Sequence, residues 1–366
     1  MITIGIDARQ LSKERLAGIG HYVVSVINCI VSEKKDVTFI LCSNREIKNY
    51  NTYGKNVKIK VIPGQIGTFW LYEKIPRYIK DDNIDIFWGP EHVLPKRVKG
   101  IKYVLTVHDV ALLINPRWGK WSNSIIQNVF VRKSVQNADS IIAISESTKN
   151  DLINLLGISE KKVLRIYNGY DSIVEHSKNE VDLINKYNIC HPFFLYVGTL
   201  EPRKNIESLI KAYEVVRKEY EIDLVLAGGL GWKYDKILKS IDECMFKDGI
   251  IRTGYVEEED KGFLYNNCVG FVFPTHYEGF GIPILEAMSN NAIVITASNS
   301  SLMEVGGDAA LYVENENDYS ELAKKMIDVI EMEGQKKESI RNKGRENVKR
   351  FSWKKCGLET LNYLIG

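Results

Sequence analysis

Residues 273–288 read Phe-Pro-Thr-His-Tyr-Glu-Gly-Phe-Gly-Ile-Pro-Ile-Leu-Glu-Ala-Met, and this stretch decides how the fold is interpreted. The apolar run at residues 269–273 predicts a buried strand. Gly279 and Gly281 then interrupt regular structure. Pro283 favours the first turn of a helix, because its missing N–H group would have no partner there. The stretch therefore predicts a strand, a glycine loop and a helix in succession.

Two glutamates bracket the predicted start of that helix. Glu278 falls in the loop after the strand, and Glu286 falls one turn into the helix. The unpaired N–H groups of Gly281 and Ile282 favour an anion. Carboxylates repel phosphate, so the glutamates would serve another part of the same ligand, and sugar or ribose hydroxyls are their natural partners. A capping glutamate beside a solvated one is the simpler alternative.

The spacing E-x-x-x-x-x-x-x-E with G-F-G-I-P inside it resembles the signature of retaining nucleotide-sugar glycosyltransferases of the GT-B fold, family 4. The resemblance implies an α/β protein with two facing Rossmann-like β/α/β domains and an interdomain cleft. It also implies a hexosyltransferase that retains the anomeric configuration of the transferred sugar. The remaining motifs of the chain can be compared with this expectation.

Length and composition fit a globular protein of two domains. The chain has 366 residues, of which 45% are hydrophobic and 26% charged. No apolar run approaches the roughly 18 residues that a membrane helix needs, and the N-terminal residues resemble a first strand, so we expect a cytoplasmic protein. The six cysteines are scattered without a C-x-x-C pair, which argues against a zinc site and against a disulfide framework.

Charge is distributed unevenly along the chain. Residues 1–170 hold 25 Lys and Arg against 15 Asp and Glu, a formal charge of +10, whereas residues 171–366 hold 24 against 32, a charge of −8. The basic half should face an anionic partner, such as the inner face of a membrane or a phosphate-bearing acceptor. A chance bias of the surface is the alternative. We expect no nucleic-acid partner.

A strand at residues 3–6 is followed by Gly18 and Gly20 and then by a helix at residues 22–31. This order is similar to a dinucleotide-binding fingerprint, but Val23 stands where the third glycine would be, so the signal is weak. The family resemblance implies that the glycine loop lies against the donor phosphate or the acceptor. A tight turn that needs positive φ is the structural alternative.

His108 and Asp109 follow an apolar strand at residues 102–107. Parallel sheets bind ligands at the carboxyl ends of their strands, so His108 is either a binding residue or a buried structural one. The family has T-x-H-D at this point, which implies that His108 contacts the donor sugar. Asp109 would then orient the imidazole ring of His108.

Strands and helices resume after a polar, unpatterned segment at residues 171–191, which we interpret as the interdomain linker. The expected domains are therefore an N-terminal acceptor-side domain, residues 1–170, and a donor-binding domain, residues 192–351. The resemblance implies that the last helix, residues 352–366, returns to the first domain.

Arg203 and Lys204 follow the first strand of the second series, just before a helix. Arginine can hold two phosphate oxygens in fixed geometry and lysine adds a mobile charge, so the pair suits a diphosphate. The segment also matches the family pattern G-x-x-x-x-x-K-N. The chain contains no D-x-D motif, so we expect no metal and no cofactor. A solvated pair of cations is the alternative.

The resemblance assigns two groups of site residues. Its catalytic residues are His108, Glu278 and Asp109. Its donor-binding residues are Gly18, Gly20, Arg203, Lys204, Tyr255, Val256, Phe280, Gly281, Ile282 and Glu286. In this scheme Glu286 takes the ribose hydroxyls, Arg203 and Lys204 neutralise the diphosphate, and Tyr255 and Val256 lie near the base.

The overall pattern looks most like bacterial mannosyl- and hexosyltransferases of polysaccharide and lipopolysaccharide assembly. The resemblance implies a nucleoside-diphosphate sugar as donor, GDP-mannose first and UDP-sugars second, and a saccharide or lipid-linked saccharide as acceptor. Two alternatives remain, a sugar-nucleotide epimerase of the same fold and a non-catalytic scaffold subunit. The incomplete glycine fingerprint disfavours an NAD-dependent dehydrogenase.

Overall fold

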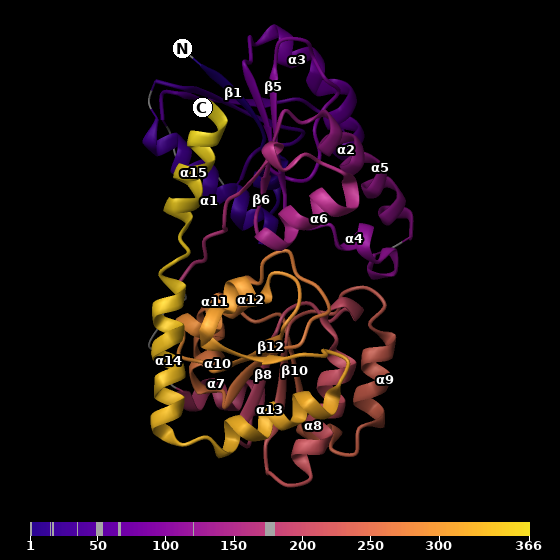
Figure 1. Cartoon of the computed structure of the whole chain (residues 1–366), viewed down its shortest axis with the longest axis vertical. Coiled ribbons are helices and arrows are strands. Elements are labelled where there is room, and N and C mark those ends of the chain that lie inside the picture. The colour runs from indigo at the N-terminus through magenta and orange to yellow at the C-terminus, as the bar shows by residue number, and fades with distance from the viewer. Residues whose placement is uncertain are drawn as a thin grey trace. The chain divides into compact units, whose positions relative to one another are not determined.

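The computed structural model describes residues 2–14, 16, 18–34, 36–48, 54–64, 67–119, 121–172 and 180–366, with the backbone alone for 121–127 and 180–182. The chain forms two compact units (Figure 1). The first contains Met1–Pro116, Trp121–Gly169 and Phe351–Gly366, and the second contains Arg117–Lys120 and Tyr170–Arg350. Each unit is built on its own parallel sheet.

The first unit has a seven-stranded sheet in the order β3-β2-β1-β4-β5-β6-β7. Its strands have apolar residues on both faces, as expected for a parallel sheet covered by helices on both sides. Ile86 and Trp88 belong to the core on one face, while Phe87 between them belongs to the core on the other. The strands are β1 (Thr3–Asp7), β2 (Thr38–Ser43), β3 (Val57–Val61), β4 (Ile86–Gly89), β5 (Lys102–Val107), β6 (Ser140–Ala143) and β7 (Val163–Arg165).

The helices that precede Gly169 connect these strands. They are η1 (Arg9–Ser12), α1 (Gly18–Glu33), α2 (Gly67–Phe69), the π-helical turn η2 (Trp70–Lys74), α3 (Ile75–Asp81), α4 (Ala111–Ile114), η3 (Pro116–Trp118), α5 (Trp121–Asn137), α6 (Glu146–Leu156) and η4 (Glu160–Lys162). Across the described residues of both units, no helix has the length and apolar character that crossing a bilayer requires.

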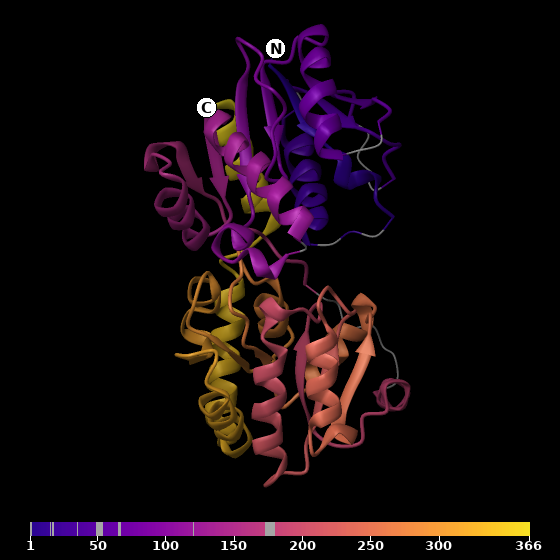
Figure 2. The same cartoon turned by 90° about the vertical axis from the view of Figure 1, so that its right-hand side faces the viewer.

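The C-terminal helix α15 (Trp353–Ile365) belongs to the first unit and packs on α1. Figure 2 shows this yellow helix among the indigo and purple elements. Gly169 makes the close approach possible, because a Cβ atom on it would lie 2.1 Å from the backbone nitrogen of Trp353. The chain therefore leaves the first unit at Gly169 and re-enters it beside the same residue.

The second unit has a six-stranded sheet in the order β10-β9-β8-β11-β12-β13. Its strands are β8 (Phe193–Val197), β9 (Asp223–Ala227), β10 (Ile250–Gly254), β11 (Gly270–Phe273), β12 (Val294–Ala297) and β13 (Ala310–Val313). Its helices are α7 (Glu180–Tyr187), η5 (Pro202–Lys204), α8 (Ile206–Arg217), α9 (Asp235–Glu243), η6 (Lys247–Gly249), α10 (Glu258–Asn267), α11 (Ile282–Ser289), α12 (Leu302–Gly306), η7 (Gly307–Ala309), α13 (Tyr319–Glu331) and α14 (Gly334–Val348).

Helix α7 corrects the interpretation of residues 171–191 as an unpatterned linker. Its apolar residues Leu183 and Tyr187 are four apart, so both face the unit and are buried. Tyr187 donates a hydrogen bond of 2.8 Å to the fully buried carboxylate of Asp260, which also pairs with Lys186. Most of the expected linker is thus part of the second unit, and residues 173–179 of it lie outside the described residues.

Both sheets reverse their strand order at one place, between β1 and β4 in the first unit and between β8 and β11 in the second. In open parallel sheets the connections on either side of such a reversal run to opposite faces, which leaves a crevice at the carboxyl ends of the two strands. A ligand site is therefore expected among the residues that follow these four strands.

Candidate active site

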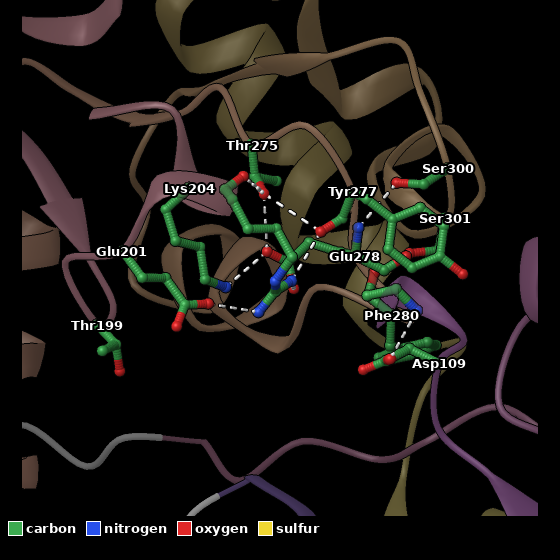
Figure 3. Close-up of polar contacts among 12 residues, drawn as sticks. Asp109, Thr199, Glu201, Lys204, Thr275, Tyr277, Glu278, Phe280, Ser300 and Ser301 are labelled. Atoms are coloured by element: carbon green, nitrogen blue, oxygen red, sulfur yellow. Dashed lines mark hydrogen bonds and ion pairs between the residues drawn. The ribbon is translucent and has the colours of Figure 1, made fainter. Parts of the chain in front are cut away.

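The reversal point of the second sheet brings together residues that are far apart in sequence. Arg203 and Lys204 follow β8 in the short turn η5, and Glu278 follows β11. Figure 3 shows Lys204 directed at the carboxylate of Glu278, with Thr275 beside it. The structure therefore brings three of the predicted residues into one cluster.

Glu278 holds both cations of the cluster. Its Oε1 lies 2.5 Å from Nζ of Lys204, and its Oε2 lies 3.0 Å from Nη1 of Arg203. The hydroxyl of Thr275 donates to Oε1 at 3.0 Å, and Arg203 also pairs with Glu201 at 2.9 Å. The side chains of Lys204 and Glu278 are each 11% exposed. The result is an ionic network that is almost fully withdrawn from water yet lies at the carboxyl ends of the strands.

Burial and pairing act in opposite directions on these groups. Burial raises the pKa of Glu278, but the charges of Lys204 and Arg203 outweigh it and lower the pKa to about 2. Burial lowers the pKa of Lys204, and the carboxylate of Glu278 opposes that shift. We take the pair as ionised at neutral pH, because Arg203 and Thr275 also donate to the same carboxylate.

Three polar residues that are not among the predicted site residues hold the loops of this cluster. Asn205 has positive φ, 57°, and its amide donates to the carbonyl oxygens of Pro274 at 3.0 Å and Glu316 at 2.5 Å. Ser301 donates to the carbonyl oxygen of Glu278 at 2.9 Å, and Thr275 donates to its carboxylate. Asparagine tolerates this backbone conformation, so the Asn after Arg203-Lys204 was a usable signal.

The predicted loop and helix after β11 are present. Gly281 precedes α11 with φ of 108°, a conformation that strongly favours glycine, and Pro283 lies in the first turn. Phe280 is buried and Ile282 begins the helix. The start of α11 therefore has the geometry that the sequence predicts.

Glu286 lies one turn into α11 and contacts helix α10. The hydroxyl of Tyr265 donates to its Oε2 at 3.0 Å, and Nζ of Lys261 lies 3.6 Å from its Oε1. Burial raises the pKa of Glu286, while Lys261 and the hydrogen bond from Tyr265 lower it. Neither Lys261 nor Tyr265 was predicted to matter, although the two stand four residues apart on one helix.

Tyr255 and Val256 follow β10, which is the edge strand of the sheet and is separated from β8 by β9. Tyr255 is 59% exposed and Val256 is buried. The structure thus places this pair at the outer edge of the sheet, away from the two strands that hold the ionic cluster.

In the first unit, His108 is buried at the end of β5. Its Nε2 donates to the carbonyl oxygen of Pro90 at 2.7 Å, since a carbonyl can only accept. The ring packs edge-on against Tyr22, with centroids 4.7 Å apart, and lies 5.2 Å from His92. Burial, helped by His92, lowers the pKa of His108 to about 3. His108 is therefore neutral at pH 7, with Nδ1 as the nitrogen that can accept a hydrogen bond.

The role expected for Asp109 needs correction. Its Oδ1 accepts a hydrogen bond of 3.0 Å from the backbone nitrogen of Ala111, at the start of α4. The carbonyl of Pro90, and not Asp109, accepts the hydrogen bond from Nε2 of His108. A short acidic side chain just before a helix is satisfied locally by the free N–H groups there, which explains the difference.

The loop expected at Gly18 and Gly20 is also wrong, because these residues are helical. Both residues lie in the first turn of α1, and neither is among the residues with positive φ. A Cβ on Gly18 would meet no atom within 4 Å, whereas one on Gly20 would lie 3.0 Å from the side chain of Leu16. Close packing therefore explains Gly20, and the backbone N–H groups of this turn belong to a helix start.

The reversal point of the first sheet holds a second group of polar residues, none of which is among the predicted site residues. The guanidinium of Arg9 donates two hydrogen bonds to the carboxylate of Asp7, from Nε to Oδ1 at 2.8 Å and from Nη2 to Oδ2 at 2.7 Å. The side-chain amide of Gln10 donates to the carboxylate of Glu91. Burial, followed by the charge of Asp7, raises the pKa of Glu91. Asp7 ends β1, Arg9 and Gln10 follow it, and Glu91 follows β4, so each unit has charged side chains where its strand order reverses.

Two family models match the chain, one to each half. The model described as Glycosyltransferase Family 4 matches residues 16–172, and Glycosyl transferases group 1 matches residues 183–347. O-antigen chain mannosyltransferase B of Escherichia coli is 31% identical over 290 residues, which are 78% of this chain and 75% of the relative. The chain belongs to glycosyltransferase family 4.

Solved structures confirm the fold of this family 4 glycosyltransferase. Sucrose-phosphate synthase from Thermosynechococcus elongatus superposes with a TM-score of 0.76 at 17% identity, over 99% of this chain and 98% of that one. Anabaena HepE in complex with UDP and glucose superposes with a TM-score of 0.73 at 16% identity, over the full length of both chains. The α/β GT-B fold that the sequence predicts is confirmed. The assignment as a glycosyltransferase rests on membership of the family.

Proposed function

We propose that this glycosyltransferase is a retaining enzyme that moves a hexose from a nucleoside-diphosphate sugar to a saccharide or lipid-linked saccharide. The observation that carries the proposal is the buried cluster of Glu278, Lys204 and Arg203 beside the start of α11. The similarity to a mannosyltransferase of O-antigen assembly supports mannose, and GDP-mannose as its donor. HepE binds UDP, which keeps UDP-sugars as the second choice.

The diphosphate of the donor would be neutralised by the protein itself. Arg203 and Lys204 supply two positive charges, and the free N–H groups at the start of α11 supply partial ones. Charge develops on the diphosphate as it leaves, so fixed donors at that point lower the barrier. We therefore propose that no metal ion is required.

Glu278 would serve both the cations and the sugar. A carboxylate has about four acceptor positions, and Lys204, Arg203 and Thr275 occupy three in the structure. One position is left for a sugar hydroxyl, so the contact with the transferred hexose positions it without releasing the cations.

The low pKa of Glu278 bears on stereochemistry. A carboxylate with a pKa of about 2 that is bound by two cations is a weak base and a weak nucleophile. The two-carboxylate scheme of retaining hydrolases needs a free nucleophile close to the anomeric carbon. We propose instead a displacement on one face of the sugar, in which the leaving diphosphate takes the acceptor proton.

The first unit would bind the acceptor at its own reversal point. Arg9, Asp7 and Glu91 offer charged groups to hydroxyls or phosphate there. His108 is neutral and would accept a hydrogen bond from a sugar hydroxyl rather than donate a proton. Asp109 would contact the substrate without orienting the ring of His108.

The donor assignment predicts selective stabilisation by one nucleotide sugar. With EDTA present, one donor should raise the melting temperature by mass action. Glu286→Ala should weaken its binding about 10- to 100-fold, because two hydrogen bonds to a charged acceptor are lost. Thermal shift and calorimetry measure both effects, with the exposed Glu243→Ala as the matched control.

Two outcomes would contradict this part of the proposal. Failure of every nucleoside-diphosphate sugar to bind, with or without magnesium, would favour a scaffold subunit. Consumption of a donor without any acceptor would favour an epimerase. The anomeric configuration of the product, read by NMR, tests retention separately.

We also propose that the first unit contacts an anionic membrane. Phe69 is 52% exposed and Val129 is 46% exposed, and Phe69 packs edge-on against Phe130 of the same helix as Val129. Lys133 lies over the ring of Tyr72 nearby, on the half of the chain that carries the +10 charge. Aromatic and basic residues together suit the headgroup region of a bilayer.

Flotation with liposomes of phosphatidylglycerol tests this contact. The protein should float with them at low salt and be released at high salt, since exposed charges are screened. Phe69→Ser should reduce flotation, whereas Met245→Ser, which replaces an exposed residue of the second unit, should not. Absence of flotation at low salt would exclude the membrane as a partner.

A further inference from the structure

Helix α10 presents Lys261 and Tyr265 to the carboxylate of Glu286. The two residues are four apart, so they lie on one face of the helix. Tyr265 donates to Oε2 at 3.0 Å, and Lys261 lies 3.6 Å from Oε1. Each oxygen of Glu286 thus has its own neighbour on α10.

We infer that Lys261 and Tyr265 are positioning residues that keep Glu286 ionised and oriented as the acceptor for the two hydroxyls of a nucleotide ribose. This rests on the proposed function, because it takes a nucleotide as the ligand of Glu286.

The inference follows from the cost of burying a carboxylate. The side chain of Glu286 is 15% exposed, so it has lost most of the water that would favour its charged form. A protonated carboxyl donates one hydrogen bond and accepts poorly, and so could not receive both hydroxyls of a ribose. Burial is the larger effect and raises the pKa of Glu286, and the cation of Lys261 within salt-bridge distance opposes that shift and favours the ionised form.

Tyr265 has a separate task from Lys261. It is fully buried and packs edge-on against Phe271 of β11, with ring centroids 5.3 Å apart. The packing against the sheet therefore fixes the position of its hydroxyl, and the hydrogen bond from this hydroxyl orients Oε2 of Glu286. Orientation comes from Tyr265 and charge comes from Lys261.

A third charge sets the balance at Glu286. Glu258, in the first turn of α10, pairs with Lys261 at 2.7 Å and repels Glu286, which raises the pKa of Glu286. Lys261 is thus shared by two carboxylates. Removing Lys261 should raise the pKa of Glu286, and removing the charge of Glu258 should lower it, which gives two variants with opposite expected signs.

The experiment measures the dissociation constant of one nucleoside-diphosphate sugar by calorimetry between about pH 5.5 and about pH 8. For Lys261→Met, the ratio of its dissociation constant to that of the wild type should rise as pH falls, by up to about tenfold per pH unit. For Glu258→Gln, the ratio of its dissociation constant to that of the wild type should decrease as pH falls. Tyr265→Phe should weaken binding at every pH, with a smaller pH dependence.

A 2′,3′-dideoxy analogue of the same nucleotide separates the ribose contact from general damage. It lacks both hydroxyls, so its binding should show no difference in pH dependence between Lys261→Met and the wild type. A purely structural role for Lys261 would lower affinity by the same factor at all pH values and for both nucleotides, and that result would overturn the inference.

A second readout needs no ligand. Carbon-13 NMR of protein labelled at glutamate carboxyls, with Glu286→Gln to identify the signal, follows the ionisation of Glu286 directly. Lys261→Met should move the titration to higher pH and Glu258→Gln to lower pH. Unmoved titrations would overturn the inference even if donors bind, whereas failure of the wild type to bind any nucleotide sugar would overturn the proposed function.

Discussion

Replacement of Lys204 by methionine is expected to lower kcat by about 10²- to 10³-fold. Its ammonium group pairs with Glu278, which lies in the loop that leads into α11, and the proposal puts the leaving diphosphate at this loop. The charge on that group grows in the transition state, so kcat should fall more than KM rises. Steady-state kinetics with the preferred donor and acceptor, per mole of folded protein, measures the effect.

Lys218→Met is the matched control for this substitution, because Lys218 is an exposed residue at the end of the helix that follows Lys204. Circular dichroism of both variants shows whether the fold is retained. A Lys204→Met enzyme that keeps nearly wild-type kcat would show that the diphosphate is neutralised elsewhere.

Replacement of Glu278 by alanine is expected to reduce the free energy of unfolding by about 3–5 kcal/mol. The reason is that two buried cations, Lys204 and Arg203, share this one carboxylate. Removing it leaves Lys204 without its carboxylate partner and Arg203 with Glu201 alone, in a region withdrawn from water. Urea unfolding at pH 7 measures the change, and transfer activity should be lost as well.

Glu316→Ala is the control for stability, since Glu316 pairs with His276 in a neighbouring loop and both side chains are more than 20% exposed. Its substitution should cost less than about 1 kcal/mol. The backbone carbonyl of Glu316 that holds Asn205 is retained in this variant. Equal losses for the two variants would contradict a special role of the buried network.

The same network makes the wild type sensitive to acid. The pKa of Glu278 is about 2 in the folded protein against an ordinary value of 4.5. A lowered folded-state pKa stabilises the protein above the ordinary value, and the contribution is lost as pH falls from about 4.5 towards 2. That contribution is on the order of 3 kcal/mol, and Glu278→Ala should lack it.

The sequence predicted the fold class because the strands, the turns and the helix starts are local features. Gly281 and Pro283 fix the entry into α11 by their own backbone preferences, without help from the rest of the chain. The continuous apolar strands likewise predict a parallel sheet that is covered by helices on both faces. These features depend only on neighbouring residues, and the structure confirms them.

The contacts within the site could not be predicted in the same way. Lys204 and Glu278 are 74 residues apart, and they meet only because β8 and β11 are neighbours in the sheet. The sequence indicated that each follows a strand, but not that the two would neutralise each other. The hydrogen bonds of His108 to Pro90 and of Glu286 to Tyr265 depend on tertiary packing in the same manner.

Two local misreadings have a different origin. The glycines at 18 and 20 were interpreted through the resemblance as a loop, although the first turn of a helix also has free N–H groups and accepts glycine. Helix α7 was missed because it is short and its apolar residues alternate with charged and polar ones. Leu183 and Tyr187 give the helical spacing, but a single pair four residues apart is a weak signal.

The return of the chain beside Gly169 means that the second unit is an insertion within the first. Apart from the short segment Arg117–Lys120, residues 170–350 form one body whose two ends attach to points in direct contact, Gly169 and the Ser352–Trp353 backbone. Such an arrangement allows one module to be gained, exchanged or lost by recombination without opening the sheet of its host. In the proposed function, the module that would bind the nucleotide can therefore change while the residues that would meet the acceptor keep their scaffold.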